Sequence, residues 1–141
     1  MNKRTIYVTA VLIVVIVASY SVWSYLNYVE YVNKTSHETS RWAVIMDSKA
    51  EIMAVETTSD EVWNRLVELY ENKEERWVGG VIEEYDNKWG FRFKPSTITI
   101  ATITIEGAQS YITGISGDLD YWINVWANVA YVLANVIEIH D

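Results

Sequence analysis

Hydrophobic and polar positions divide the chain into one continuous apolar segment and a longer part with mixed patterns. Residues 6–26 contain no charged side chain and are mostly aliphatic. This length of α-helix spans roughly 31 Å, which matches the hydrocarbon core of a bilayer. The segment is therefore predicted to be a transmembrane helix, with the following residues as its anchor: Ile6, Val11, Leu12, Val15, Ile16 and Trp23.

The residues that flank this segment predict its orientation. Lys3 and Arg4 precede it, and aromatic residues crowd its far end: Tyr20, Trp23, Tyr25, Tyr28 and Tyr31. Basic residues favour the cytoplasmic side, and Trp and Tyr favour the membrane–water interface. We therefore expect a single-pass protein with residues 1–35 as anchor and juxtamembrane segment. Residues 36–141 would then form a domain outside the cytoplasm, at the cell surface.

Two other interpretations of the apolar segment remain open. A cleaved signal peptide has the same cationic start and a short apolar core, which residues 8–18 provide, and Val17-Ala18-Ser19 fits a cleavage site. A buried core helix is the second alternative. Asn33-Lys34-Thr35 is a sequon for N-glycosylation, so Asn33 is a candidate modification site and adds slightly to the extracytoplasmic assignment.

The next pattern predicts a β-hairpin followed by a helix. Residues 42–55 are rich in strand-forming residues and have a turn at Asp47-Ser48. Thr58 and Glu61 have the spacing of a capping box, which predicts a helix that begins after Thr58 and runs to about Glu75. Apolar residues would form one broad face of this helix: Val62, Trp63, Leu66, Val67, Leu69 and Tyr70.

An aromatic strand is expected in the middle of the domain. Gly79-Gly80 is predicted to break the chain before a strand at residues 81–85 and a turn at Asp86-Asn87. Beyond the turn, aromatic residues alternate with Gly90, Arg92 and Lys94, which predicts an aromatic inner face and a cationic outer face. The aromatic residues are Trp89, Phe91 and Phe93, and Pro95 ends or bends the strand.

The C-terminal third is less regular. In residues 96–106 the isoleucines change phase near Ala101-Thr102, and a β-bulge there would turn all four towards the core; alternatively, both faces are covered. Helical spacing predicts a short helix over residues 108–122, interrupted near Gly117. Residues 124–139 fit either a helix or a strand, and periodicity does not decide between them. The fold class expected is α+β: a small, mostly antiparallel β-sheet with one or two packed helices, preceded by a transmembrane helix.

Over residues 41–139 the order of these motifs resembles a small α+β domain family. Archaeal, bacterial and amoebal proteins contain this domain, and the family is named after the N-terminal domain of an amoebal calcium-dependent protein. The best-matching residues are Trp89, Phe91, Pro95, Ser96, Ile98, Ile103, Glu106, Tyr111, Leu119, Asp120 and Trp122. The chain departs from the family at residues 107–109, where many relatives have a cysteine and an Asp-Gly pair. The resemblance implies a strand over residues 124–139 and a helix over residues 108–122, but no defined activity.

Composition and charge exclude several classes of function. Residues 35–141 carry 8 basic and 18 acidic side chains, a net charge of −10, which disfavours nucleic acid as a partner. The absence of cysteine excludes disulfides and thiolate chemistry. His37 and His140 lack the spacing of metal ligands, and Asp118 and Asp120 lack the rest of a calcium loop. We therefore expect no cofactor, no metal site and no catalytic residues.

Four residues remain as candidates for contact with a ligand or partner. Arg92 and Lys94 could bind an anion or a lipid headgroup, although pairing with Glu84 or its neighbours is the simpler interpretation. Trp77 and Trp126 could form an exposed aromatic platform. The expected function is a non-enzymatic binding module, with the lipid bilayer and either a membrane or surface protein or a second copy as partners. The alternatives are a filament or assembly subunit that packs through its apolar helix, and an extracytoplasmic hydrolase that uses carboxylates.

Overall fold

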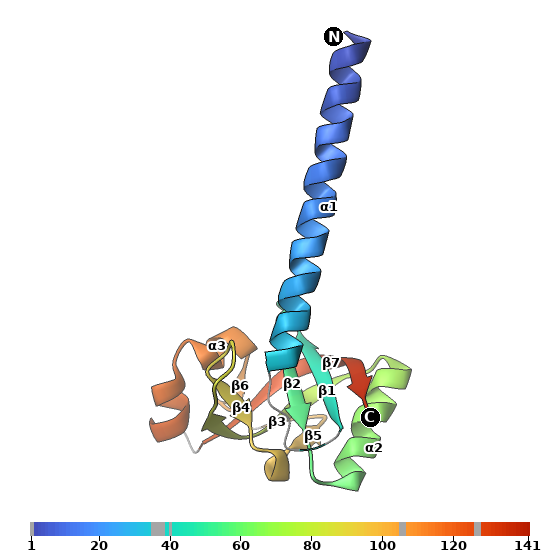
Figure 1. Cartoon of the computed structure of the whole chain (residues 1–141). Helices are drawn as coiled ribbons and strands as arrows, with labels where there is room; N and C mark the ends of the chain where they lie inside the picture. The colour runs from blue at the N-terminus through green and yellow to red at the C-terminus, as the bar shows by residue number, and fades with distance from the viewer. Residues whose placement is uncertain (1, 35–38, 40, 105–106, 126–127) are drawn as a thin grey trace. The chain divides into compact units, whose positions relative to one another are not determined.

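The computed structural model describes residues 2–34, 39, 41–104, 107–125 and 128–141 (Figure 1). The chain divides into two compact units, Met1–Lys34 and Thr35–Asp141. The first unit is a single helix, and the second is an antiparallel, curled sheet with short helices. The α+β fold class predicted from the sequence is therefore confirmed.

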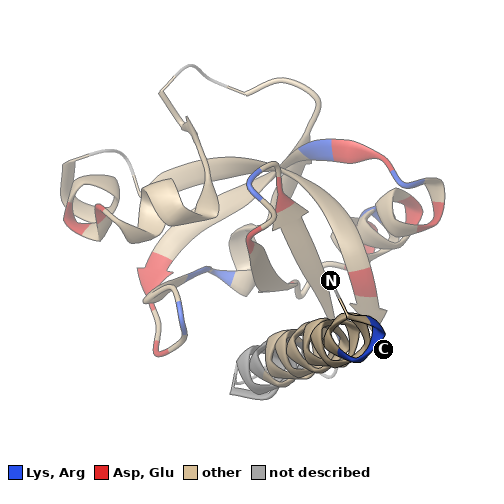
Figure 2. Cartoon of the chain, turned by 90° about the horizontal axis from the view of Figure 1, so that it is seen from above, with Lys and Arg blue, Asp and Glu red and all other residues tan. Residues whose placement is uncertain are grey.

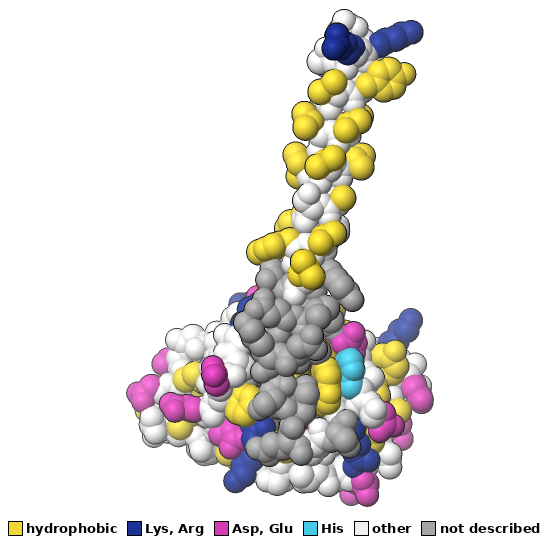
Figure 3. All heavy atoms as spheres, in the orientation of Figure 1, with side chains coloured by type: hydrophobic (Ala, Val, Ile, Leu, Met, Phe, Trp, Pro, Cys, Tyr) yellow, Lys and Arg dark blue, Asp and Glu magenta, His cyan; other side chains and the backbone are white. Residues whose placement is uncertain are grey.

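Helix α1 (Lys3–Lys34) contains the predicted apolar segment. Its first 22 residues, Lys3–Ser24, are long and apolar enough to cross a membrane, and none of the window that meets this test is buried. Hydrophobic side chains cover this part of the helix, with cations at its N-terminal end (Figure 3). The Thr9 and Ser21 hydroxyls each donate a 2.9 Å hydrogen bond to the carbonyl four residues earlier, so neither needs water as a partner.

The second unit is organised around two long central strands. Strand β3 (Glu75–Glu84) and strand β7 (Val129–His140) pair antiparallel over seven residue pairs. In the described chain the main strand order is β2-β1-β7-β3-β4, with β1 (Trp42–Asp47), β2 (Ile52–Glu56) and β4 (Phe91–Phe93). Strand β5 (Thr99–Ala101) also pairs with β3, and β6 (Gln109–Ser110) pairs in parallel with β7.

The β1–β2 turn is built by a buried carboxylate. Asp47 is 4% exposed, and its Oδ1 accepts hydrogen bonds from the backbone N–H groups of Lys49 and Glu51, both at 3.0 Å. Its Oδ2 accepts a third bond, also 3.0 Å, from Ile112, the first residue of helix α3 (Ile112–Ser116). The predicted turn is thus confirmed, and the aspartate that makes it also fixes the start of α3.

Helix α2 (Asp60–Asn72) has a different cap from the one predicted. Ser59 is the N-cap, and its hydroxyl accepts from the Val62 N–H at 3.2 Å, so Thr58 was the wrong cap. The helix ends at Asn72 because Lys73 adopts the left-handed conformation, with φ 53°. Most of its contacts are with β7, and its buried face consists of Trp63, Leu66 and Leu69.

Gly79-Gly80 does not break the chain, contrary to the prediction, but lies in the middle of β3. A Cβ at residue 79 would lie 2.1 Å from the Ala130 carbonyl oxygen, and one at residue 80 would lie 2.8 Å from Thr97 Oγ1. The glycines therefore permit close approach of neighbouring backbones rather than a turn. The predicted strand at residues 81–85 is therefore only half as long as β3.

The predicted aromatic face of the middle segment is confirmed. Trp89, Phe91 and Phe93 are 7%, 0% and 2% exposed, and the two Phe rings meet edge to face with centroids 5.9 Å apart. The indole Nε1 of Trp89 donates a 2.7 Å hydrogen bond to the Ile52 carbonyl of β2. Pro95 ends β4 as expected and begins the 3₁₀ turn η1 (Pro95–Thr97).

The C-terminal third differs in part from the prediction. Ile98 is buried, but Ile103 is 84% exposed, so the isoleucines do not all face the core, and Ile105 lies outside the described residues. The helix expected over residues 108–122 is confirmed in part: α3 ends before Gly117, where the interruption was predicted, and the helical turn η2 (Tyr121–Val125) follows. Residues 109–110 form β6 instead. Residues 129–140 form β7, which agrees with the strand implied by the family resemblance.

Candidate functional site

The predicted anchor residues all lie on described turns of α1 with exposed side chains. Ile6, Leu12, Ile16 and Trp23 are among them, and the Trp23 ring lies near that of Tyr20, with centroids 6.2 Å apart. An exposed apolar surface along Lys3–Ser24 is what contact with lipid requires. For Asn33 and for the other predicted belt residues, Tyr25, Tyr28 and Tyr31, the structure describes the helical backbone and not the side chains.

The Arg92 guanidinium is enclosed by its own sheet. Its Nε lies 2.6 Å from Glu83 Oε1, directly across the β3–β4 pair, and the guanidinium carbon lies 4.3 Å from the centre of the Tyr85 ring. The Arg92 side chain is only 12% exposed. This geometry matches the cross-strand pair considered from the sequence, with Glu83 rather than Glu84 as the partner.

The structure places two of the other three candidate contact residues, Lys94 and Trp77. Lys94 is exposed beyond the end of β4, where its N–H donates to the Val81 carbonyl at 2.8 Å. Trp77 lies half-buried in β3 between Leu133 of β7 and Ala101 of β5. Trp126, the second tryptophan of the predicted platform, lies outside the described residues.

Several titratable groups of the described residues take part in structural contacts. His140 stacks on Trp42, with ring centroids 3.7 Å apart, and its Nε2 lies 3.2 Å from Glu138 Oε2. The Asp120 carboxylate accepts a 2.7 Å hydrogen bond from Asn124. Within the described ranges, no group of three or more His, Asp or Glu side chains could hold a metal ion; His37 lies outside them. Acidic positions lie in turns, near strand ends and on α2, as Figure 2 shows.

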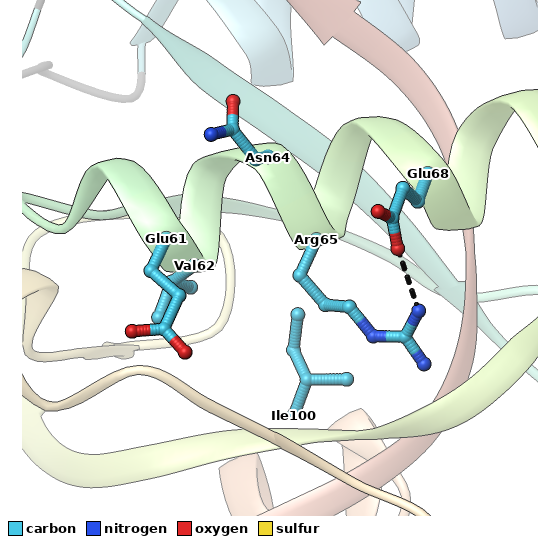
Figure 4. A pocket seen from close by; sticks show the side chains of 6 residues that line it. All are labelled: Glu61, Val62, Asn64, Arg65, Glu68 and Ile100. Atoms are coloured by element: carbon cyan, nitrogen blue, oxygen red, sulfur yellow. Dashed lines mark hydrogen bonds and ion pairs between the residues drawn. The ribbon is translucent and has the colours of Figure 1, made fainter.

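A hollow lies between α2 and β5 (Figure 4). Its volume is about 410 Å³, and it is open to solvent on one side. Ile100 of β5 and Val62 of α2 provide apolar lining. Arg65 lies between Ile100 and Glu68 and is paired with Glu68 at 2.7 Å. The remaining lining residues are Glu61 and Asn64.

Sequence reasoning missed this hollow. The α2 residues that line it were assigned either to the apolar face or to the solvated face of the helix, and Ile100 was assigned to the core. The signal available was the phase change between Ile100 and Ile103, which marks where β5 ends. The position of α2 beside β5 depends on contacts between segments about 35 residues apart, which local periodicity does not report.

Five of the ten described residues that carry the family resemblance are buried. Trp89, Phe91, Pro95 and Ile98 are buried, and Trp122 is 7% exposed. Glu106 lies outside the described residues. No family model matches the chain, and no curated protein or solved structure shows significant similarity to it.

Proposed function

We propose that this protein is a single-pass, membrane-anchored binding module whose domain, residues 36–141, lies outside the cytoplasm and has no catalytic role. The observation that carries the proposal is the apolar segment Lys3–Ser24, 22 residues long with none of its tested window buried. An exposed helix of this composition is unfavourable in water and suited to lipid. Lys3 and Arg4 at its start support an N-terminus in the cytoplasm.

The domain supports a role in binding rather than catalysis. Among the described residues, the carboxylates that face the interior are engaged in structure, as Asp47 is with three backbone N–H groups. The surface instead offers the hollow beside α2 and a strongly acidic charge. We further propose that residues 41–139 belong to the small α+β family that they resemble, which the observed fold class supports.

The absence of cysteine permits a clean test of topology. Single cysteines would be introduced by Ser48→Cys in the β1–β2 turn and by Asn2→Cys before α1, two exposed positions. Intact cells expressing each full-length variant would be treated with a membrane-impermeant maleimide. We expect labelling of S48C in intact cells and labelling of N2C only after permeabilisation. The reverse pattern, or recovery of N2C protein without its leader, would reject the orientation or the retained anchor.

The proposed role in binding requires a separate test. The full chain would be crosslinked in native membranes, extracted in detergent and analysed for mass and composition. A second protein at fixed stoichiometry would support the binding module. Ladders that contain this chain alone would favour the alternative of a structural subunit that packs through α1. Turnover of a glycoside or ester substrate by the purified protein would favour the hydrolase.

A further inference from the structure

Hydrogen-bond directions along β3 determine which groups of β5 face away from the sheet. The Val81 N–H donates to Thr97 Oγ1 at 2.9 Å, and its carbonyl accepts from the Lys94 N–H at 2.8 Å, so Val81 faces the β4–β5 side. The Ile82 N–H donates to the Asn128 carbonyl at 2.7 Å, towards β7. Because these directions alternate along a strand, Trp77 and Gly79 also face the β4–β5 side.

The register of β5 then places the backbone of Ile100 on the outer edge. Gly79 lies opposite Thr99 and Trp77 opposite Ala101, so those two β5 residues bond to β3. Ile100, which lies between them, directs its N–H and carbonyl away from β3. Among the described residues, no other strand pairs with β5 on that side. An edge of this kind is a template for one more strand.

The hollow lies beside this backbone position. Ile100 stands opposite Val78, a fully buried residue, so its side chain is on the face of the sheet that packs against the core. That side chain and Val62 line the hollow, and α2 forms its other wall (Figure 4). An extended segment added to β5 would thus place alternate side chains in the hollow.

The charges at the rim indicate which side chains would fit. Glu61 is exposed at the rim of the hollow, and Glu68 forms an ion pair with Arg65. The lining therefore carries two carboxylates and one guanidinium. The domain as a whole carries a net charge of −10. An incoming Lys or Arg next to an apolar side chain would be complementary to both features.

We propose that β5 and α2 form a strand-addition site for an extended segment of a partner protein that presents apolar and basic side chains on one face. The inference rests on the proposed binding function and specifies where and how binding occurs. Backbone hydrogen bonds to Ile100 would hold the segment, and the hollow would select its side chains.

The chemistry can be tested with a peptide and the full-length protein in lipid nanodiscs. The probe is a capped peptide of sequence Thr-Val-Thr-Lys-Thr-Val-Thr, with a control in which Glu replaces Lys. We expect the lysine peptide to slow hydrogen exchange of the Ile100 amide about fivefold or more. The glutamate peptide should bind about threefold more weakly or worse. Equal binding of the two peptides, or binding without any effect on the Ile100 amide, would overturn the proposal.

Two variants of Ile100 separate the contribution of its backbone N–H to peptide binding from that of its side chain. Ile100→Pro removes the outward N–H and should weaken lysine-peptide binding at least tenfold, whereas proline is tolerated on an edge strand when its N–H position faces outward. Ile100→Ala keeps the N–H and should weaken binding less. Melting of both variants would be measured to establish that they are folded. Full affinity of folded I100P for the lysine peptide would contradict strand addition. If I100P does not fold, hydrogen exchange of the Ile100 amide in the unmodified protein tests the proposal instead.

The same variants distinguish this site from the general function. A partner that crosslinks to the unmodified protein and equally to folded I100P would leave the binding module intact and reject the β5 site. Loss of that crosslink in I100P, together with binding of the lysine peptide, would support the site. A third outcome is that the unmodified protein self-associates, that I100P does not, and that the lysine peptide does not bind. This outcome would identify a second copy of the chain as the occupant of the site and would overturn the proposal.

Discussion

Strands β4 and β5 lie on the same side of β3 and are separated by a single 3₁₀ turn, yet their environments are opposite. The outer edge of β4 is closed: the Asn87 side chain donates to the Phe91 carbonyl at 2.8 Å, and the Trp89 indole bonds to β2. The edge of β5 faces a solvent-open hollow instead. Phe91 and Phe93 are buried, whereas Ile100 is half-buried.

The difference separates a strand that builds the core from the proposed binding strand within one short stretch of sequence. β4 delivers aromatic side chains to the core, and the indole of Trp89, just before β4, bonds to β2. β5 contributes less to the core and retains an unpaired backbone position next to a helix. Binding sites occur where a rigid scaffold leaves polar groups unsatisfied at a concave surface, and β5 meets this description better than β4.

The largest effect is expected from Phe91→Asp. Phe91 is 0% exposed, and an isolated carboxylate at this position would lack a compensating partner, which costs several kcal/mol. We expect the domain to lose its cooperative thermal transition, as measured by circular dichroism. The matched control is Lys94→Asp, an exposed position in the same segment, with an expected change below about 0.5 kcal/mol. Unchanged melting of F91D would show that β4 does not form the core.

Proline substitutions in β5 test which of its backbone N–H groups point towards β3 and which point away. Thr99→Pro removes an N–H directed at β3 and should lower the free energy of unfolding by about 2–3 kcal/mol. Ile100→Pro removes an outward N–H, so its cost should exceed that of Ile100→Ala by less than about 1 kcal/mol. Thr99→Val controls for the 2.9 Å contact between Thr99 Oγ1 and the Tyr131 hydroxyl. Equal destabilisation by the two prolines, measured by urea unfolding, would contradict the assigned register.

The sequence predicted β4 well because its evidence is local. Strict alternation of aromatic and polar residues, followed by Pro95, determines both the strand and its buried face. The Asp47-Ser48 turn and the centre of the apolar face of α2 were predictable for the same reason, although Tyr70, which was predicted on that face, is 44% exposed. Each depends on residues a few positions apart.

Predictions failed where contacts distant in sequence decide the structure. Gly79-Gly80 has the composition of a turn, but Ala130 and Thr97 approach so closely that only glycine fits within the strand. The phase change in the isoleucine pattern coincides with the end of β5 at Ala101, but it could not show that α2 lies beside that strand. The hollow was hidden for the same reason.

Trp89→Phe measures how much one hydrogen bond, from the Trp89 indole to β2, contributes to the stability of the domain. The substitution retains most of the buried ring but removes the Nε1 donor, which leaves the Ile52 carbonyl without its 2.7 Å partner. We expect a loss of about 1–2 kcal/mol in the free energy of unfolding from urea denaturation. Hydrogen exchange should also accelerate most in β2. A loss confined to β3, with β2 unaffected, would show that Trp89 does not close the sheet.

Glu83→Gln gives the smallest expected effect and tests whether Arg92 is committed to the sheet. The pair joins β3 to β4 at 2.6 Å, with the Arg92 side chain 12% and the Glu83 side chain 32% exposed. Cross-strand ion pairs contribute about 0.2–1 kcal/mol, so the variant should lose stability within that range, and the loss should shrink at high salt. Glu84→Gln, at the exposed neighbouring position, is the control and should change stability less. If E83Q were neutral while binding anionic lipid vesicles more strongly, Arg92 would be an available surface cation, and the contrast between a closed β4 and an open β5 would fail.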